Sequence, residues 1–192
     1  GGAALFEEAV TVPTINITGA NSADEDSTAT FNKAVTASSG ITLNDSAGDA
    51  KIIFAANNSV TITGTIDGAS SDEGTIQVTG ATKTFSGAIG TTQALTLIDI
   101  DNTSTFNEAI SATNINVADS ITATAKKAIT ATAIVLDGGT LVLSDNNSVT
   151  IAGTINGSNT TEGTLQITGA TKTFSGAIGT TQALTLIDVD NA

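Results

Sequence analysis

Two pairs of aspartates are the residues of this chain best placed to do chemistry. Asp99 and Asp101 lie two residues apart, and Asp188 and Asp190 repeat the same spacing further along. On a β-strand this spacing directs both carboxylates of a pair to one face. Because calcium is bound by hard oxygen ligands such as carboxylates, each pair is a candidate calcium site.

Two other interpretations of the aspartate pairs stay open. A pair of carboxylates could act as the acid pair of a glycoside hydrolase, or it could mark a strand end whose aspartates are solvated. The pair recurs at equivalent places, which suits architecture better than a single active site. A sugar-cleaving groove would also normally offer Trp or Tyr, and the chain has neither. We therefore expect no enzyme activity and no catalytic residue.

A second acidic cluster lies in the segment NSADEDS at residues 21–27. Its Asp24, Glu25 and Asp26 could also hold calcium, but the segment lacks the ligand and glycine spacing of an EF-hand. We interpret it as a solvated loop.

Thr-x-Thr pairs, at Thr61/Thr63 and Thr122/Thr124, form another pattern. On a flat solenoid face, a regular threonine array can order water and bind ice. These pairs do not recur on successive segments, so we interpret them as outward strand positions. Lys83 and Lys172, each within the sequence TKTF, are likewise expected to point outward.

The composition of the 192 residues excludes many kinds of site. There is no His, Cys or Met, and all six basic residues are Lys. Nucleophilic triads that use His or Cys are therefore excluded, as are zinc, haem and iron–sulfur sites built on them. A net charge of −13 disfavours nucleic acids and anionic membranes as partners. No run of 18 apolar residues is present, so we expect no membrane span.

One stretch of the sequence occurs twice. Residues 57–102 recur as residues 146–191, a shift of 89, and 37 of the 46 paired positions are identical. The block TGATKTFSGAIGTTQALTLID is unchanged between the copies. A duplicated unit within one chain suggests stacking, because each copy can bury a face that it cannot bury alone.

Short segments in which apolar and polar residues alternate recur along the chain, which is typical of β-strands. Several of them follow the one before at a nearly constant spacing. The eight segments start at Ile15, Ile41, Ile76, Leu95, Ile115, Ile134, Leu165 and Leu184. A second element, Phe-x-x-Ala-(Ile/Val), starts at Phe6, Phe31, Phe85, Phe106 and Phe174. Ala125 occupies the place where a further Phe would fall.

A period of about 20 residues fits one coil of a β-solenoid, whose strands stack about 4.8 Å apart. The sequence therefore predicts an all-β fold with a single elongated domain over residues 1–192. We expect a parallel β-helix, right-handed, in which all eight segments return to the same side of the coil. The alternative is a β-sandwich subunit joined to its neighbours by donor-strand exchange. Residues 57–72 and 146–161 interrupt the period and are expected to form an extra strand or a side arm.

The phrases VTITGTIDG, GTIQVTGATKTFSGAIGTTQALTLIDID and TFNEAISATNINV resemble large repetitive bacterial surface proteins. The resemblance is nearest to the passengers of autotransporter adhesins, including rickettsial-type surface cell antigens, and it covers most of the chain. It implies an exported β-solenoid with a structural or adhesive role, and no catalytic residue carries over. Abundant Ser, Thr, Asn, Gly and Ala also fit a protein exported in bulk, so we expect an extracellular or cell-surface location.

The two ends of the sequence are complementary. The chain closes on LTLIDVDNA, whereas the matching LTLIDIDN of the first copy continues into TSTFNEAI, an element that GGAALFEEAV could supply. We therefore expect either head-to-tail stacking of copies or neighbouring repeats of a longer chain. The predicted function is a structural subunit or segment of an extracellular filament, sheath or surface layer. The alternative is an adhesin passenger that binds a glycan or another host-surface ligand.

Overall fold

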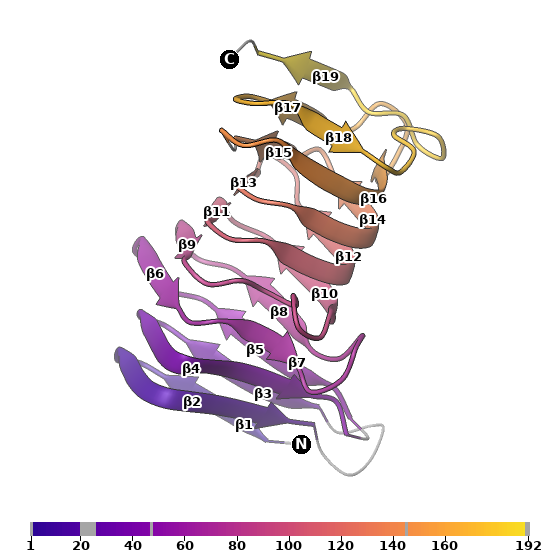
Figure 1. The fold of residues 1–192 in the computed structure, drawn as a ribbon. Helices are drawn as coiled ribbons and strands as arrows, with labels where there is room; N and C mark the ends of the chain where they lie inside the picture. Colours follow the sequence, from indigo (N-terminus) through magenta and orange to yellow (C-terminus); the bar gives the residue numbers. More distant parts are fainter. Residues whose placement is uncertain (1, 20–25, 47, 145, 191–192) are drawn as a thin grey trace.

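The computed structural model describes residues 2–19, 26–46, 48–144 and 146–190. The regular elements in these ranges are all β-strands, and the strands pair in parallel. Figure 1 shows the chain winding from its N-terminal coils at one end of a stack to its C-terminal coils at the other. The fold is a β-solenoid of about eight coils with about 22 residues per coil. This confirms the predicted fold class, and the sandwich alternative is wrong.

Strand pairs and isolated bridges arrange the coils into three faces. The first face contains five complete strands and the second halves of three long strands. These strands are β1 (Ala3–Phe6), β3 (Ser27–Phe31), β5 (Ala50–Phe54), β8 (Thr75–Val78), β10 (Leu95–Ile100), β12 (Ile110–Val117), β14 (Ile129–Leu136) and β16 (Val149–Gly157).

The second face follows the first within each coil. It contains the first halves of two long strands and seven short strands. These strands are β2 (Val10–Thr18), β4 (Val35–Asn44), β6 (Val60–Thr63), β9 (Lys83–Phe85), β11 (Ser104–Phe106), β13 (Thr122–Ala125), β15 (Thr140–Leu143), β17 (Thr164–Ile167) and β19 (Leu186–Val189).

The third face completes each coil and links the other two. The second halves of β2 and β4 and the first halves of β12, β14 and β16 belong to it, together with β7 (Ile66–Gly68) and β18 (Lys172–Phe174). A bridge through Ile89 connects Ile66 with Ile110 and keeps this face continuous. The segments at residues 57–72 and 146–161, expected as an extra strand or a side arm, contribute β6, β7 and the whole of β16 to the sheets.

Corners between faces depend on backbone that turns sharply. Gly64, between β6 and β7, has a φ of 115°, a conformation that side chains with a Cβ rarely adopt. A Cβ built at Gly64 would lie 2.1 Å from the carbonyl oxygen of Ala37 on the preceding coil. Glycine is therefore required here both for the turn and for the close approach of two coils.

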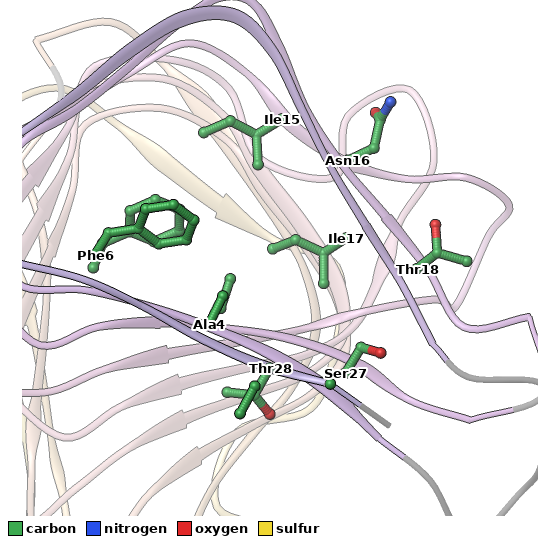
Figure 2. A pocket seen from close by; sticks show the side chains of 12 residues that line it. Ala4, Phe6, Ile15, Asn16, Ile17, Thr18, Ser27 and Thr28 are labelled. Atoms are coloured by element: carbon green, nitrogen blue, oxygen red, sulfur yellow. The ribbon is translucent and has the colours of Figure 1, made fainter.

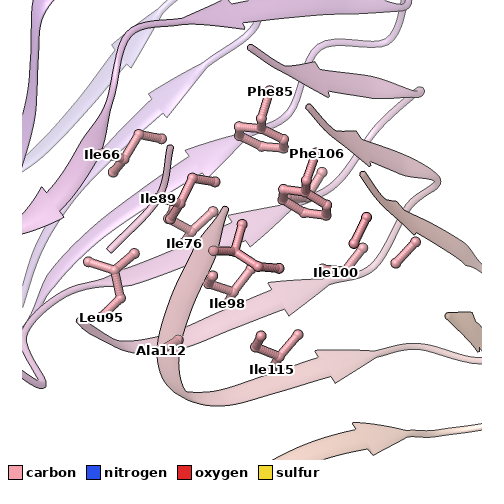
Figure 3. Packing of buried hydrophobic residues seen from close by; sticks show 14 of the residues in the cluster. Ile66, Ile76, Phe85, Ile89, Leu95, Ile98, Ile100, Phe106, Ala112 and Ile115 are labelled. Carbon is pink, nitrogen blue, oxygen red and sulfur yellow. The ribbon is translucent and has the colours of Figure 1, made fainter. Parts of the chain in front are cut away.

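Inward-facing side chains form continuous columns through the stack. On the first face Ile76, Ile98, Ile115, Ile134 and Ile155 follow one another in register, and none is more than 2% exposed. Figure 3 shows three of them, Ile76, Ile98 and Ile115, following one another along the stack. Full burial of a side chain of this size contributes about 1.5–3 kcal/mol, so these columns are the main source of stability.

Five of the six phenylalanines form a ladder inside the N-terminal part of the core. Phe6 stacks on Phe31 with ring centroids 4.6 Å apart, and Phe85 stacks on Phe106 at 5.0 Å. Phe54 joins the two groups, with centroids 6.1 Å from Phe31 and 5.4 Å from Phe85. The ladder stops where Ala125 pairs with Phe106, which confirms that Ala125 occupies the place of a further Phe.

The prediction that all eight alternating segments return to one side of the coil is wrong, because the coils differ in length. The step along the chain from Ile76 to Ile98 is longer than the step from Ile98 to Ile115, although each crosses one coil. The segments divide among the faces, with those at Ile76, Ile115 and Ile134 on the first, Leu165 on the second, and Ile15 and Ile41 on the third.

The two copies of the duplicated unit consequently occupy different faces. Lys83–Phe85 forms β9 on the second face, whereas the identical Lys172–Phe174 forms β18 on the third face. The column from Ile76 to Ile155 passes through four coils, and these four coils take up less chain than the shift between the copies. A residue of the second copy therefore lies four coils further along the rod than its equivalent in the first copy, and on the face that follows next in the coil.

Candidate functional site

The aspartates of the first pair lie at one corner of the rod. Asp99 is on the outward side of β10, at the register position between Gln77 and Asn116. Asp101 follows the strand, and its carboxylate accepts a 2.6 Å hydrogen bond from the side-chain amide of Gln77. Burial, and after it the charge of Asp101, raise the pKa of Asp99 above its ordinary value. Lys51 and a hydrogen bond from Asn116 act in the opposite direction.

The second pair repeats this contact on another face. The side-chain amide of Gln166 donates to Asp190 at 2.8 Å and to Asp188 at 3.4 Å. Gln77 and Gln166 each precede their aspartate partner by 24 residues, about one coil. The glutamine partner was not predicted, although its equivalent position in both copies was a signal that could have revealed it.

Calcium binding at these aspartates stays a prediction. Asp99, Asp101 and Asp137 line one shallow depression together with Asn116 and Ser158. Calcium takes six to eight oxygen ligands. No group of three or more His, Cys, Asp or Glu suited to a metal ion occurs within the ranges that the structure describes. Of the acidic cluster at residues 21–27, Asp24 and Glu25 lie outside those ranges, and Asp26 accepts a 3.3 Å hydrogen bond from the backbone of Asp49.

Lys83 points into the core, so the prediction that it faces outward is wrong. Its side chain is fully buried. The ammonium donates hydrogen bonds to the carbonyl oxygens of Ala56 (2.8 Å), Thr79 (3.0 Å) and Ala81. Burial lowers the pKa of Lys83 from about 10.5 to about 8. The three carbonyls take the place of water around the cation, which offsets the cost of burying it.

Lys172, the equivalent residue of the second copy, also turns toward the backbone. Its ammonium donates to the carbonyl oxygens of Thr168 (3.4 Å) and Ala170 (2.5 Å), and the side chain is half-buried. The expectation of an outward lysine is therefore wrong at both positions. In each copy the lysine donates hydrogen bonds to carbonyl oxygens of the turn that precedes its strand, which stabilises that turn.

Threonines recur in register on the second face, contrary to the expectation that Thr-x-Thr pairs do not repeat. One row runs through Thr61, Thr84, Thr105 and Thr124 on four successive coils. Another runs through Thr122, Thr140 and Thr164. Thr82 and Thr103 immediately precede the paired residues Lys83 and Ser104, and they extend that second row toward the N-terminus. These nine residues are called the threonine face below.

The two ends of the rod carry the exposed apolar side chains. Large hydrophobic residues that are exposed within the described ranges all belong to β1 or β19, and they are Leu5, Phe6, Leu186, Ile187 and Val189. Figure 2 looks into the N-terminal end, where Phe6, Ile15 and Ile17 face a common space between two strands. This hollow has a volume of about 320 Å³ and is largely apolar. Each end therefore presents an open cross-section of the core.

The described residues contain no helix that could cross a membrane. Comparisons with protein-family models, with curated proteins and with solved structures find no match to this chain.

Proposed function

We propose that this chain is a non-enzymatic structural segment of an extracellular filament, sheath or surface layer. Each of its two ends would stack on the end of another solenoid. The observation that supports this proposal is the location of the exposed apolar side chains. Phe6 is 37% exposed at one end and Val189 is 68% exposed at the other. Both occupy inward-facing positions, because Phe6 pairs with buried Phe31 and Val189 pairs with Ile167.

Stacking another coil on either end would bury these side chains. Complete burial is worth about 1.5–3 kcal/mol for a residue of this size, and the terminal strands also gain a backbone partner. The surface at β1 differs from the surface at β19, so contacts between copies would be head to tail. Head-to-tail contacts that do not close produce open filaments. Further coils of one polypeptide would cover the ends in the same way.

The charge of the chain opposes this association. Each copy carries a net charge of −13, and copies stacked end to end repel one another at low ionic strength. At about 0.15 M salt the screening length is about 8 Å. Moderate salt or divalent cations should therefore increase association, whereas light scattering that does not respond to either would count against it.

A charged substitution at the C-terminal end tests the proposal. Val189→Lys places an ammonium in the contact, whereas Val135→Lys places the same charge on the outward side of β14, which has paired strands on both sides. Sedimentation velocity and electron microscopy should show head-to-tail rods for the wild type and for Val135→Lys. Val189→Lys should give single rods. Wild-type chains that remain single at high concentration and in salt would contradict self-association and favour an isolated adhesive rod.

A further inference from the structure

The hydroxyl groups of the threonine face are free to bind something outside the protein. None of the nine threonine hydroxyls makes a hydrogen bond with another residue that the structure describes, although the backbone N–H of Thr103 donates to the side chain of Asn102 at 2.8 Å. Elsewhere on the rod, several threonine hydroxyls are used internally. Thr96, for example, donates to the carbonyl oxygen of Asp72 at 2.6 Å, and Thr154 donates to that of Thr132 at 3.2 Å. The threonine face therefore differs from those threonines in its chemistry as well as in its regularity.

The spacing of these hydroxyls is set by the sheet. Strands on successive coils lie about 4.8 Å apart, and residues two apart on a strand lie about 6.7 Å apart. The pairs Thr82/Thr84, Thr103/Thr105 and Thr122/Thr124 therefore form a two-dimensional lattice of hydroxyl and methyl groups. Water bridged between such hydroxyls would be held in a repeating pattern in both directions at once.

The rest of this surface suits frozen water better than other ligands. The next residues of the row that contains Thr124, Val142 and Gln166, are uncharged, and Lys83 beneath the array is buried. The row meets a charged residue at Asp188, in the terminal strand β19. An ionised side chain would hold its own hydration shell and disturb an ice-like layer. A crystalline polysaccharide would normally be met by aromatic platforms, and the chain has no Trp or Tyr.

We propose that the threonine face binds ice. Its hydroxyls and methyl groups hold a layer of ordered water that merges with the surface of a crystal, so that the side of the rod adheres while the ends remain available for stacking. The proposal does not depend on end-to-end association, because the array lies within a single chain.

Two matched double variants test it. Thr84→Lys/Thr105→Lys places charge in the centre of the array, at two residues that pair in register. Thr150→Lys/Thr173→Lys makes the same change at two exposed residues that pair in register on the third face. Thr173 also lies in the same sequence, ATKTFSGAIG, as Thr84. The two double variants match in residue type, pairing and added charge. They differ in face and also in exposure, because Thr84 and Thr105 are half-buried.

Two measurements are made. One is the incorporation of the protein into a slowly growing ice hemisphere, and the other is the gap between the freezing and melting temperatures of ice in the protein solution. The wild type and Thr150→Lys/Thr173→Lys should enter the ice and open such a gap, and Thr84→Lys/Thr105→Lys should do neither. Circular dichroism melts establish that the variants fold, and Thr84→Val/Thr105→Val, which keeps the methyl groups and the strand shape, should lose part of the effect. Exclusion of the wild type from ice, or equal loss in both lysine variants, would overturn the proposal. Retention on crystalline cellulose or chitin without incorporation into ice would overturn it too.

Discussion

Phe54 and Phe85 meet edge to face, with ring centroids 5.4 Å apart and ring planes at 76°. Phe54 ends a strand of the first face, whereas Phe85 ends a strand of the second face. The contact is therefore the point at which the phenylalanine ladder passes from one side of the core to the other. The change of ring orientation fits this crossing, because the rings approach from different strands and an edge-to-face pair is a favourable arrangement.

Removing a ring from this ladder should be costly, and the duplicated unit supplies the control. Phe85 is 1% exposed, whereas Phe174 occupies the same sequence but is half-buried near the end of the rod. Phe85→Ala should lower the free energy of unfolding by about 3–5 kcal/mol, as is usual for a fully buried Phe. Phe174→Ala should cost less than half as much. Urea unfolding followed by circular dichroism measures both, and equal losses would show that the ladder is not the main support.

Lys83 should make stability rise with pH. Its pKa is about 8 in the folded chain and near 10.4 when unfolded, so between these values the unfolded chain binds more protons. Stability therefore increases as the pH rises through this window. Lys83→Met should remove this part of the increase in melting temperature between pH 7 and pH 10, while Lys172→Met should change it less. Identical pH profiles for the wild type and Lys83→Met would contradict the prediction.

Asp99 should have the opposite effect at lower pH. Because its pKa is raised in the folded chain, ionisation of Asp99 reduces stability as the pH rises through that pKa. Asp99→Asn removes the charge beside Asp101 and should raise the melting temperature at pH 7 by about 1–3 °C. The gain should vanish near pH 3. Asp188→Asn, in the terminal strand β19, is the matched control, and an Asp99→Asn chain that melts lower at pH 7 would refute the prediction.

If the aspartate pairs bind calcium, the thermal stability of the chain should depend on calcium. Millimolar calcium should raise the melting temperature of the wild type relative to EDTA, because a ligand that binds only the folded state stabilises it. Asp99→Asn/Asp101→Asn should reduce the rise, and Asp188→Asn/Asp190→Asn should reduce it by a similar amount. Unchanged melting with and without calcium in all three proteins would exclude the site.

The solenoid itself could be predicted because its determinants are local. Alternation within β5, for example, places Ala50, Ile52 and Phe54 inward, and all three are fully buried. The nearly regular spacing of such segments along the chain was enough to indicate stacked coils. The pairing of Ala125 with Phe106 shows that even a missing member of the ladder could be located from its place in the period.

The face on which a segment lies could not be predicted, because it depends on the lengths of all the coils before it. Lys83 and Lys172 have identical neighbours in sequence, yet they lie on different faces. The threonine rows were missed for a related reason. Thr82 and Thr103 precede their strands, and only the pairing of Lys83 with Ser104 shows that they are aligned. The hydrogen bond between Gln77 and Asp101 could not be predicted either, because it depends on how one coil stacks on the next.

The one-face offset between the two copies has a consequence for how such a rod can change length. Recombination within the block that is unchanged between the copies would delete or add one whole unit and leave both junctions native. Each added unit would lengthen the rod by about 20 Å, at about 4.8 Å per coil, and would turn every coil beyond it by one face. Three additions would restore the original orientation. In a chain lengthened in this way, equivalent surface residues of successive units would follow a helical path around the rod.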